Sequence, residues 1–157
     1  MELQEYATAL GKILANLQSL EFAVRAFLYE RGDLPHQPLP SGTDLHDLKV
    51  GDTVPENALT SYDSLGQLVD RYNRAVNDLQ LAVDRSVVDL RDALAHGRVS
   101  APLTAPNLSL LKFERPKAGS TKVAYYQELS PQWLSEQVKR VFGELQKVAK
   151  AGGAQFT

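Results

Sequence analysis

Apolar residues recur at helical spacing along the first thirty positions of the chain. Two columns with a spacing of seven make up this stripe: Leu3, Leu10, Leu17 and Val24, and Tyr6, Ile13, Leu20 and Phe27. The spacing predicts one amphipathic helix over residues 2–31, about 45 Å long at ~1.5 Å per residue. Gly32 follows this segment, as expected of a glycine at a helix C-terminus.

A second segment, residues 58–96, returns to the same spacing without any proline. The apolar positions that repeat every seven residues in it are Val69, Val76, Val83 and Leu90. This unbroken register favours a single long helix, with a kink or a turn at Asn77-Asp78 as the alternative. Gly97 is expected to end the helix.

The remaining segments complete the predicted architecture. Residues 34–57 contain four Pro and two Gly, which predicts an irregular insert. The simplest interpretation is a tolerated surface loop, and the alternative is a lid or a partner-binding segment. Residues 108–129 hold two strand-like runs around a turn and predict a small β-hairpin. Ser130 and Pro131 begin a last helix over 131–150. The pattern therefore predicts a single all-α domain over residues 1–157, a helical bundle with the hairpin appended.

Composition narrows the class of protein. The chain has 157 residues, of which 43% are hydrophobic and 23% charged, with no cysteine, so disulfides and thiolate metal sites are excluded. His36 and His46 lie on the proline-rich insert without ligand spacing, and no phosphate-binding glycine loop is present. We therefore expect neither a metal nor a cofactor. Without an apolar run long enough to cross a bilayer, we expect a soluble, cytoplasmic protein with no membrane contact.

Charge is distributed unevenly along the chain. The net charge is −2, whereas proteins that bind nucleic acid by charge alone are usually strongly basic. Residues 107–150 hold eight Lys or Arg against four Glu, so this part is the better candidate for an anionic partner, although an ordinary solvated surface is the favoured reading. Tyr125 and Tyr126 in the hairpin are candidates to stack on bases, with one of them expected to pack inward.

The end of the second helical segment holds the strongest candidate for chemistry. Asp92 and His96 are four residues apart, so they share a helix face and are predicted to form a hydrogen bond that fixes the imidazole tautomer. Arg91 supplies a planar cation suited to a phosphate. Five helical residues rotate by about 140°, so Arg91 and His96 diverge unless the helix end is distorted or a second chain takes part. A plain Asp92–His96 salt bridge at the helix C-terminus is the simpler alternative.

The segment Arg91-Asp92-Ala93-Leu94-Ala95-His96-Gly97 resembles the signature of the HEPN superfamily (higher eukaryotes and prokaryotes nucleotide-binding domains). That motif is an arginine, usually followed by Asn, Asp or His, and a histidine after four to six intervening residues. The resemblance implies an all-α bundle of long antiparallel helices, usually a homodimer in which two copies of the motif meet. It also implies that Arg91, Asp92 and His96 are the catalytic residues.

The function implied by the resemblance is metal-independent cleavage of RNA. Many members are endoribonucleases in toxin–antitoxin or phage-defence systems, where a small nucleotidyltransferase would be a fitting antitoxin. Others keep the fold and only bind nucleotides or proteins. The chain is therefore interpreted as an endoribonuclease, with a non-catalytic dimeric module that binds a protein or a nucleotide as the alternative.

Glu21 is singled out by periodicity and not by the motif. It occupies the column Ala7, Leu14, Glu21 and Leu28 in the apolar stripe of the first helix, where an unpaired buried carboxylate would be costly. We expect it to orient an arginine, either Arg91 or Arg25, in support of the candidate site. The alternative is a glutamate at the stripe edge that reaches water.

Overall fold

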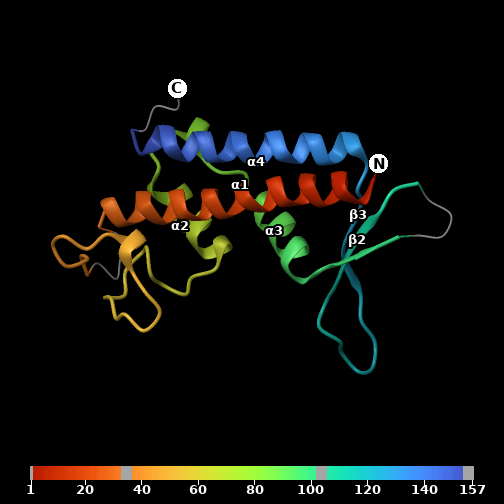
Figure 1. Cartoon of the computed structure of the whole chain (residues 1–157), viewed down its shortest axis with the longest axis horizontal. Coiled ribbons are helices and arrows are strands. Elements are labelled where there is room, and N and C mark those ends of the chain that lie inside the picture. The colour runs from red at the N-terminus through yellow and green to blue at the C-terminus, as the bar shows by residue number, and fades with distance from the viewer. Residues whose placement is uncertain (1, 33–36, 102–105, 154–157) are drawn as a thin grey trace.

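Two long helices form one side of the molecule. The computed structural model describes residues 2–32, 37–101 and 106–153. Helices α1 (Leu3–Glu30) and α4 (Pro131–Ala151) lie side by side in it (Figure 1). Both were predicted, and at α4 the Ser130 hydroxyl accepts a hydrogen bond from the backbone N–H of Trp133, with proline at the first helical position. The signal that begins α4 is therefore confirmed, as is Gly32 after the end of α1, where its φ is 70°.

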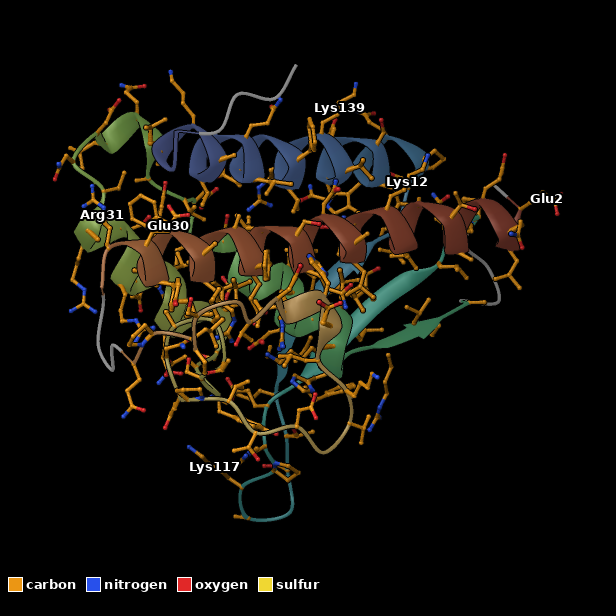
Figure 2. The ribbon with its side chains drawn as sticks, turned by 60° about the vertical axis from the view of Figure 1, so that its left-hand side comes forward. Glu2, Lys12, Glu30, Arg31, Lys117 and Lys139 are labelled. Carbon is orange, nitrogen blue, oxygen red and sulfur yellow. The ribbon has the colours of Figure 1, made fainter. Side chains whose placement is uncertain are left out.

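The two long helices run parallel, which corrects the expected antiparallel bundle. The Asn16 amide donates to the backbone carbonyl of Val138 at 3.2 Å, and the first turns of both helices line one shallow groove. Lys12 and Lys139 accordingly mark corresponding parts of α1 and α4 in Figure 2. The parallel arrangement arises because the chain returns to the N-terminal end of α1 before α4 begins.

The segment 58–96 is not one helix. It contains α2 (Leu65–Ala75), a 3₁₀ turn (Leu79–Leu81) and α3 (Ser86–His96), with α2 beginning only after the Ser64 capping box. The Asn73 amide bonds both the N–H and the carbonyl of Val83, and the Asp78 carboxylate caps the 3₁₀ turn. These side-chain bonds satisfy backbone groups outside a helix and so favour the break. Val76 and Val83 are buried on either side of it, which is why the repeat looked continuous.

A three-stranded antiparallel sheet makes the fold mixed α/β and overturns the all-α prediction. The strands β1 (Arg98–Ser100), β2 (Ser109–Phe113) and β3 (Val123–Glu128) pair in the order β1-β2-β3. The hairpin of β2 and β3 was predicted; β1 was not, because three residues after a glycine carry no strand pattern. Leu110 and Leu129 are buried in the main core, so the sheet is anchored to the helices.

The insert before α2 is irregular, as predicted for its described part. Residues 37–57 contain one 3₁₀ turn, Leu45–Asp47, and otherwise loops, and the loop continues to residue 64 although helix was expected from residue 58. The buried Asn57 fastens the loop, since its amide donates to the carbonyl of Gln37 at 2.8 Å and its oxygen accepts from the N–H of Leu59 at 2.9 Å. The loop is thus held by hydrogen bonds from the Asn57 side chain to backbone groups.

Gly97 joins α3 directly to β1 at a point of close approach. Its N–H closes the helix on the Ala93 carbonyl at 2.7 Å. A Cβ at this position would lie 2.9 Å from the Leu111 carbonyl and 2.8 Å from Leu110 Cδ1. Only a residue without a side chain lets β2 come this near to the end of α3.

Replacing Gly97 by alanine is therefore expected to lower the free energy of unfolding by about 1–3 kcal/mol, through overpacking against backbone. Urea denaturation measures the change. Gly143 in α4 provides the matched control, because a Cβ there meets nothing within 4 Å. Gly143→Ala should leave stability unchanged or raise it by up to about 1 kcal/mol. Equal effects of the two substitutions would contradict the close approach.

Candidate functional site

Arg91 lies in a hollow between α3 and the middle of α1. The hollow has a volume of about 460 Å³ and is lined by Leu14, Leu17, Gln18, Glu21, Phe22, Arg25, Arg91 and Ala95. The Arg91 side chain is 37% exposed, and its Nη1 lies 3.3 Å from Asp92 Oδ1. The cation is therefore available at the surface rather than locked in a buried ion pair.

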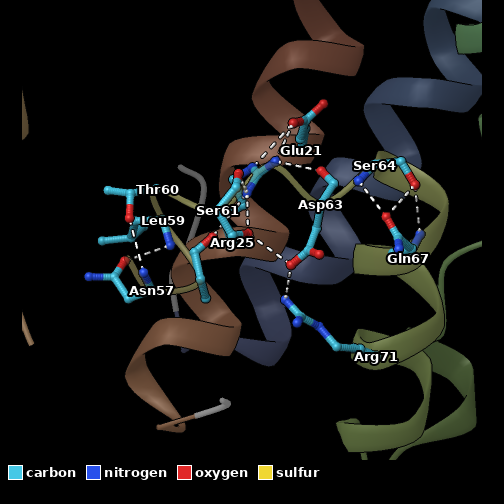
Figure 3. Close-up of polar contacts among 11 residues, drawn as sticks. Glu21, Arg25, Asn57, Leu59, Thr60, Ser61, Asp63, Ser64, Gln67 and Arg71 are labelled. Carbon is cyan, nitrogen blue, oxygen red and sulfur yellow. Dashed lines mark hydrogen bonds and ion pairs between the residues drawn. The ribbon is translucent and has the colours of Figure 1, made fainter. Parts of the chain in front are cut away.

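Glu21 pairs with Arg25, one of its two expected partners. Arg25 Nε and Nη2 donate to Glu21 Oε1 at 3.1 and 2.9 Å, and the side chains are 11% and 28% exposed for Arg25 and Glu21. The same guanidinium donates to the backbone carbonyls of Ala58, Ser61 and Asp63 (Figure 3). Glu21 thus helps to hold a structural arginine, while it shares the hollow with Arg91.

Asp92 faces two cations and not His96. Its carboxylate lies 3.3 Å from Arg91 Nη1 and 3.5 Å from Lys112 Nζ on β2. Asp92 and His96 both belong to the described part of the chain, and no hydrogen bond joins them there. The predicted helix pair is wrong because β2 brings Lys112 beside Asp92, which the sequence spacing could not show.

His96 lines a different hollow, on the sheet side of α3. This hollow has a volume of about 370 Å³ and is lined by His96, Arg98, Phe113, Glu114, Arg115, Pro116 and Thr121. His96 is exposed, and the Arg98 guanidinium lies 5.5 Å from the centroid of the Phe113 ring. The helix rotation between positions 91 and 96 explains why one chain places Arg91 and His96 in separate hollows.

The neighbours of His96 were missed by sequence reasoning. Arg98 follows the helix directly, whereas Phe113, Glu114 and Arg115 come from the far end of β2 and Thr121 from the turn. Antiparallel pairing of Arg98 with Leu111 brings these distant segments beside the helix end. The basic character of residues 107–150 pointed to this part of the chain. Its position beside His96 could not be predicted, because β1, the strand that pairs with β2 there, is only three residues long.

The chemistry of the His96 hollow suits an anionic substrate. An imidazole and a carboxylate are groups that transfer protons, and two guanidinium groups can bind phosphate oxygens. Within the described residues, no group of three or more His, Asp or Glu side chains is arranged to hold a metal ion. His36 lies outside the described residues. None of the described helices is long and apolar enough to cross a membrane.

Comparison with family models, with curated proteins and with solved structures finds no match to this chain. The likeness to HEPN domains therefore rests on the residues of the motif alone.

Proposed function

We propose that this protein is a metal-independent endoribonuclease of the type that the HEPN motif implies, with His96 as a proton-transferring group. The observation that supports this is the position of His96, exposed in a hollow that also presents Arg98, Glu114 and Arg115. An imidazole that shares a hollow with a carboxylate and two arginines supplies groups that can serve metal-free phosphodiester cleavage.

The proposed reaction uses the 2′-hydroxyl of the RNA as the nucleophile. A bond forms between O2′ and phosphorus while the bond between phosphorus and O5′ breaks, which yields a 2′,3′-cyclic phosphate and a free 5′-hydroxyl. One proton leaves the 2′-hydroxyl and one arrives at O5′. His96 takes part in one of these transfers, and Glu114 is the neighbouring group for the other. Arginine side chains stabilise the charge that builds on the phosphate oxygens.

A role for Arg91 at the same phosphate requires a second chain. Arg91 and His96 line separate hollows in one chain, so we propose a homodimer in which Arg91 of one protomer meets His96 of the other. Asp92 lies against Arg91 and orients it. In this proposal Glu21 supports the Arg91 hollow through Arg25.

The dimeric site is tested by mixing two inactive variants, Arg91→Ala and His96→Ala. If each site combines two chains, the mixed dimers hold one intact site, and a 1:1 mixture recovers about one quarter of the wild-type activity. Mixing Arg91→Ala with the double variant provides the control, because no intact site can assemble. Failure of the single variants to complement each other, while each is inactive alone, would contradict a site shared between chains.

A biological role as a cytoplasmic toxin or phage-defence effector extends the proposal. Expression of the wild-type chain should then arrest growth, and His96→Ala should relieve the arrest. Co-expression of an antitoxin such as a small nucleotidyltransferase should restore growth of cells that express the unsubstituted chain. Equal growth arrest by the wild type and His96→Ala would show that toxicity does not depend on His96.

The alternative is a non-catalytic module that binds a protein or a nucleotide. The Arg91 hollow favours it, because the exposed Leu14 and Phe22 of α1 border that hollow and apolar rims are typical of protein contacts. In that case His96→Ala and Arg91→Ala would both leave RNA intact, as the wild type would. The cleavage assay therefore decides between the two functions.

A further inference from the structure

One face of the sheet carries exposed aromatic side chains towards the hairpin turn. Arg98, Leu111 and Tyr126 are register partners across the three strands and so lie on one face. Phe113, two residues after Leu111, shares that face, since the Arg98 guanidinium lies over its ring. Tyr126 is 61% exposed and Phe113 is 40% exposed. Two aromatic rings, from β2 and β3, and an arginine from β1 are thus presented to solvent.

Leu110 and Tyr125 lie on the opposite face of the sheet. Leu110 is buried in the core, and Tyr125 is half-buried, where loss of hydration raises the pKa of its phenol. The expectation that one of the two hairpin tyrosines packs inward is confirmed, with Tyr125 inside and Tyr126 outside. The outer aromatic residues therefore do not serve the core of this chain.

The segment that forms this sheet carries an excess of cations that suits a polyanion, while Lys112 lies on the opposite face beside Asp92. From Arg98 to Glu128 the chain carries five Lys or Arg against two Glu, although the whole protein has a net charge of −2. Arg98 and Arg115 belong both to this segment and to the His96 hollow. Lys117 lies at the tip of the hairpin, away from the helices (Figure 2). The cations are thus concentrated on the element that carries the exposed aromatic rings.

We propose that the outer face of the sheet, formed by Arg98, Phe113 and Tyr126, binds single-stranded RNA and leads it into the His96 hollow. Bases stack on the Phe113 and Tyr126 rings, and backbone phosphates meet Arg98 and Arg115. The inference rests on the proposed function for the choice of RNA, because cleavage there needs a 2′-hydroxyl. Its geometric part, two aromatic rings and Arg98 on one exposed sheet face, holds independently.

The single-stranded form is the one that fits this surface. Stacking on an aromatic side chain requires a base whose face is free, and the bases of a duplex are stacked on each other. The surface is therefore proposed to select unpaired RNA over duplex RNA and not to select a base sequence.

Binding is measured by fluorescence anisotropy with a labelled 2′-O-methyl RNA, which lacks the attacking hydroxyl and cannot be cleaved. Phe113→Ala and Tyr126→Ala should each weaken binding by about five- to a hundred-fold, the range of one lost stacking contact. Tyr126→Phe keeps the ring and should bind like the wild type. Tyr62→Ala is the matched control, since Tyr62 is fully exposed on the loop before α2. A self-complementary duplex should compete poorly.

Unchanged affinity in Phe113→Ala and Tyr126→Ala would overturn the inference, as would equal binding of duplex and single strand. Loss of self-association with RNA affinity retained would also overturn it and would identify this face as a protein contact. If the face binds RNA as described but unmodified RNA is not cleaved, the inference stands and the proposed function fails. If cleavage depends on His96 but not on these two rings, the proposed function stands and the inference fails.

Discussion

Replacing His96 by alanine is expected to lower kcat/KM for cleavage of single-stranded RNA by at least about 100-fold. Loss of a group that transfers a proton in the transition state typically costs 10²–10⁴-fold, since the proton must then move to or from water. The measurement is the initial rate of cleavage of a labelled RNA with the substrate well below KM.

Two controls separate this effect from a loss of structure. His46→Ala removes another exposed histidine, which lies on the Leu45–Asp47 turn and is distant in sequence from His96. This variant should cleave RNA at the wild-type rate. Because His96 is exposed, His96→Ala should change the free energy of unfolding by no more than about 0.5 kcal/mol. A His96→Ala rate equal to that of the wild type would remove His96 from the reaction.

The second large effect is expected at Arg25 and concerns stability. Arg25 is 11% exposed and ties α1 to the loop before α2, through Glu21 and three backbone carbonyls. Removing its guanidinium leaves Glu21 and these carbonyls without their donor in a partly buried place. Arg25→Ala should therefore lower the free energy of unfolding by about 3 kcal/mol.

Urea denaturation of Arg25→Ala beside Arg74→Ala tests this. Arg74 is exposed, and the hydrogen bond of its Nε goes to the Asp70 carbonyl of its own helix, so its replacement should cost no more than about 0.5 kcal/mol. Arg25→Lys should recover only part of the loss, because an ammonium cannot reproduce the planar fork of donors. Equal small losses at positions 25 and 74 would show that the loop is held by other contacts.

The long helices could be predicted because their signals are local. A continuous apolar stripe with clear ends describes α1, and Ser130 with Pro131 marks the start of α4. The direction in which the two helices pack was not predictable in this way. It depends on where the sheet returns the chain, which is a property of the whole topology.

The break between α2 and α3 shows the limit of periodicity. Val76 and Val83 keep the heptad spacing because both are buried, and burial alone does not require a helix between them. The bonds of Asn73 with Val83 decide the local structure. Such pairings across ten residues leave no periodic signal in the sequence.

The candidate site was predictable in its motif and not in its surroundings. Arg91 and His96 were found from their spacing, and their divergence followed from helix geometry. Lys112 beside Asp92, and Arg115 beside His96, are brought by strand pairing from distant positions. These contacts turn an isolated histidine at a helix end into part of a polar hollow.

The most direct test of the central proposal is incubation of the purified wild-type protein with single-stranded RNA in excess EDTA, with His96→Ala in parallel. We expect cleavage by the wild type alone, with products that carry 2′,3′-cyclic phosphate and 5′-hydroxyl ends. Intact RNA in both reactions, or the same products from both proteins, would contradict it.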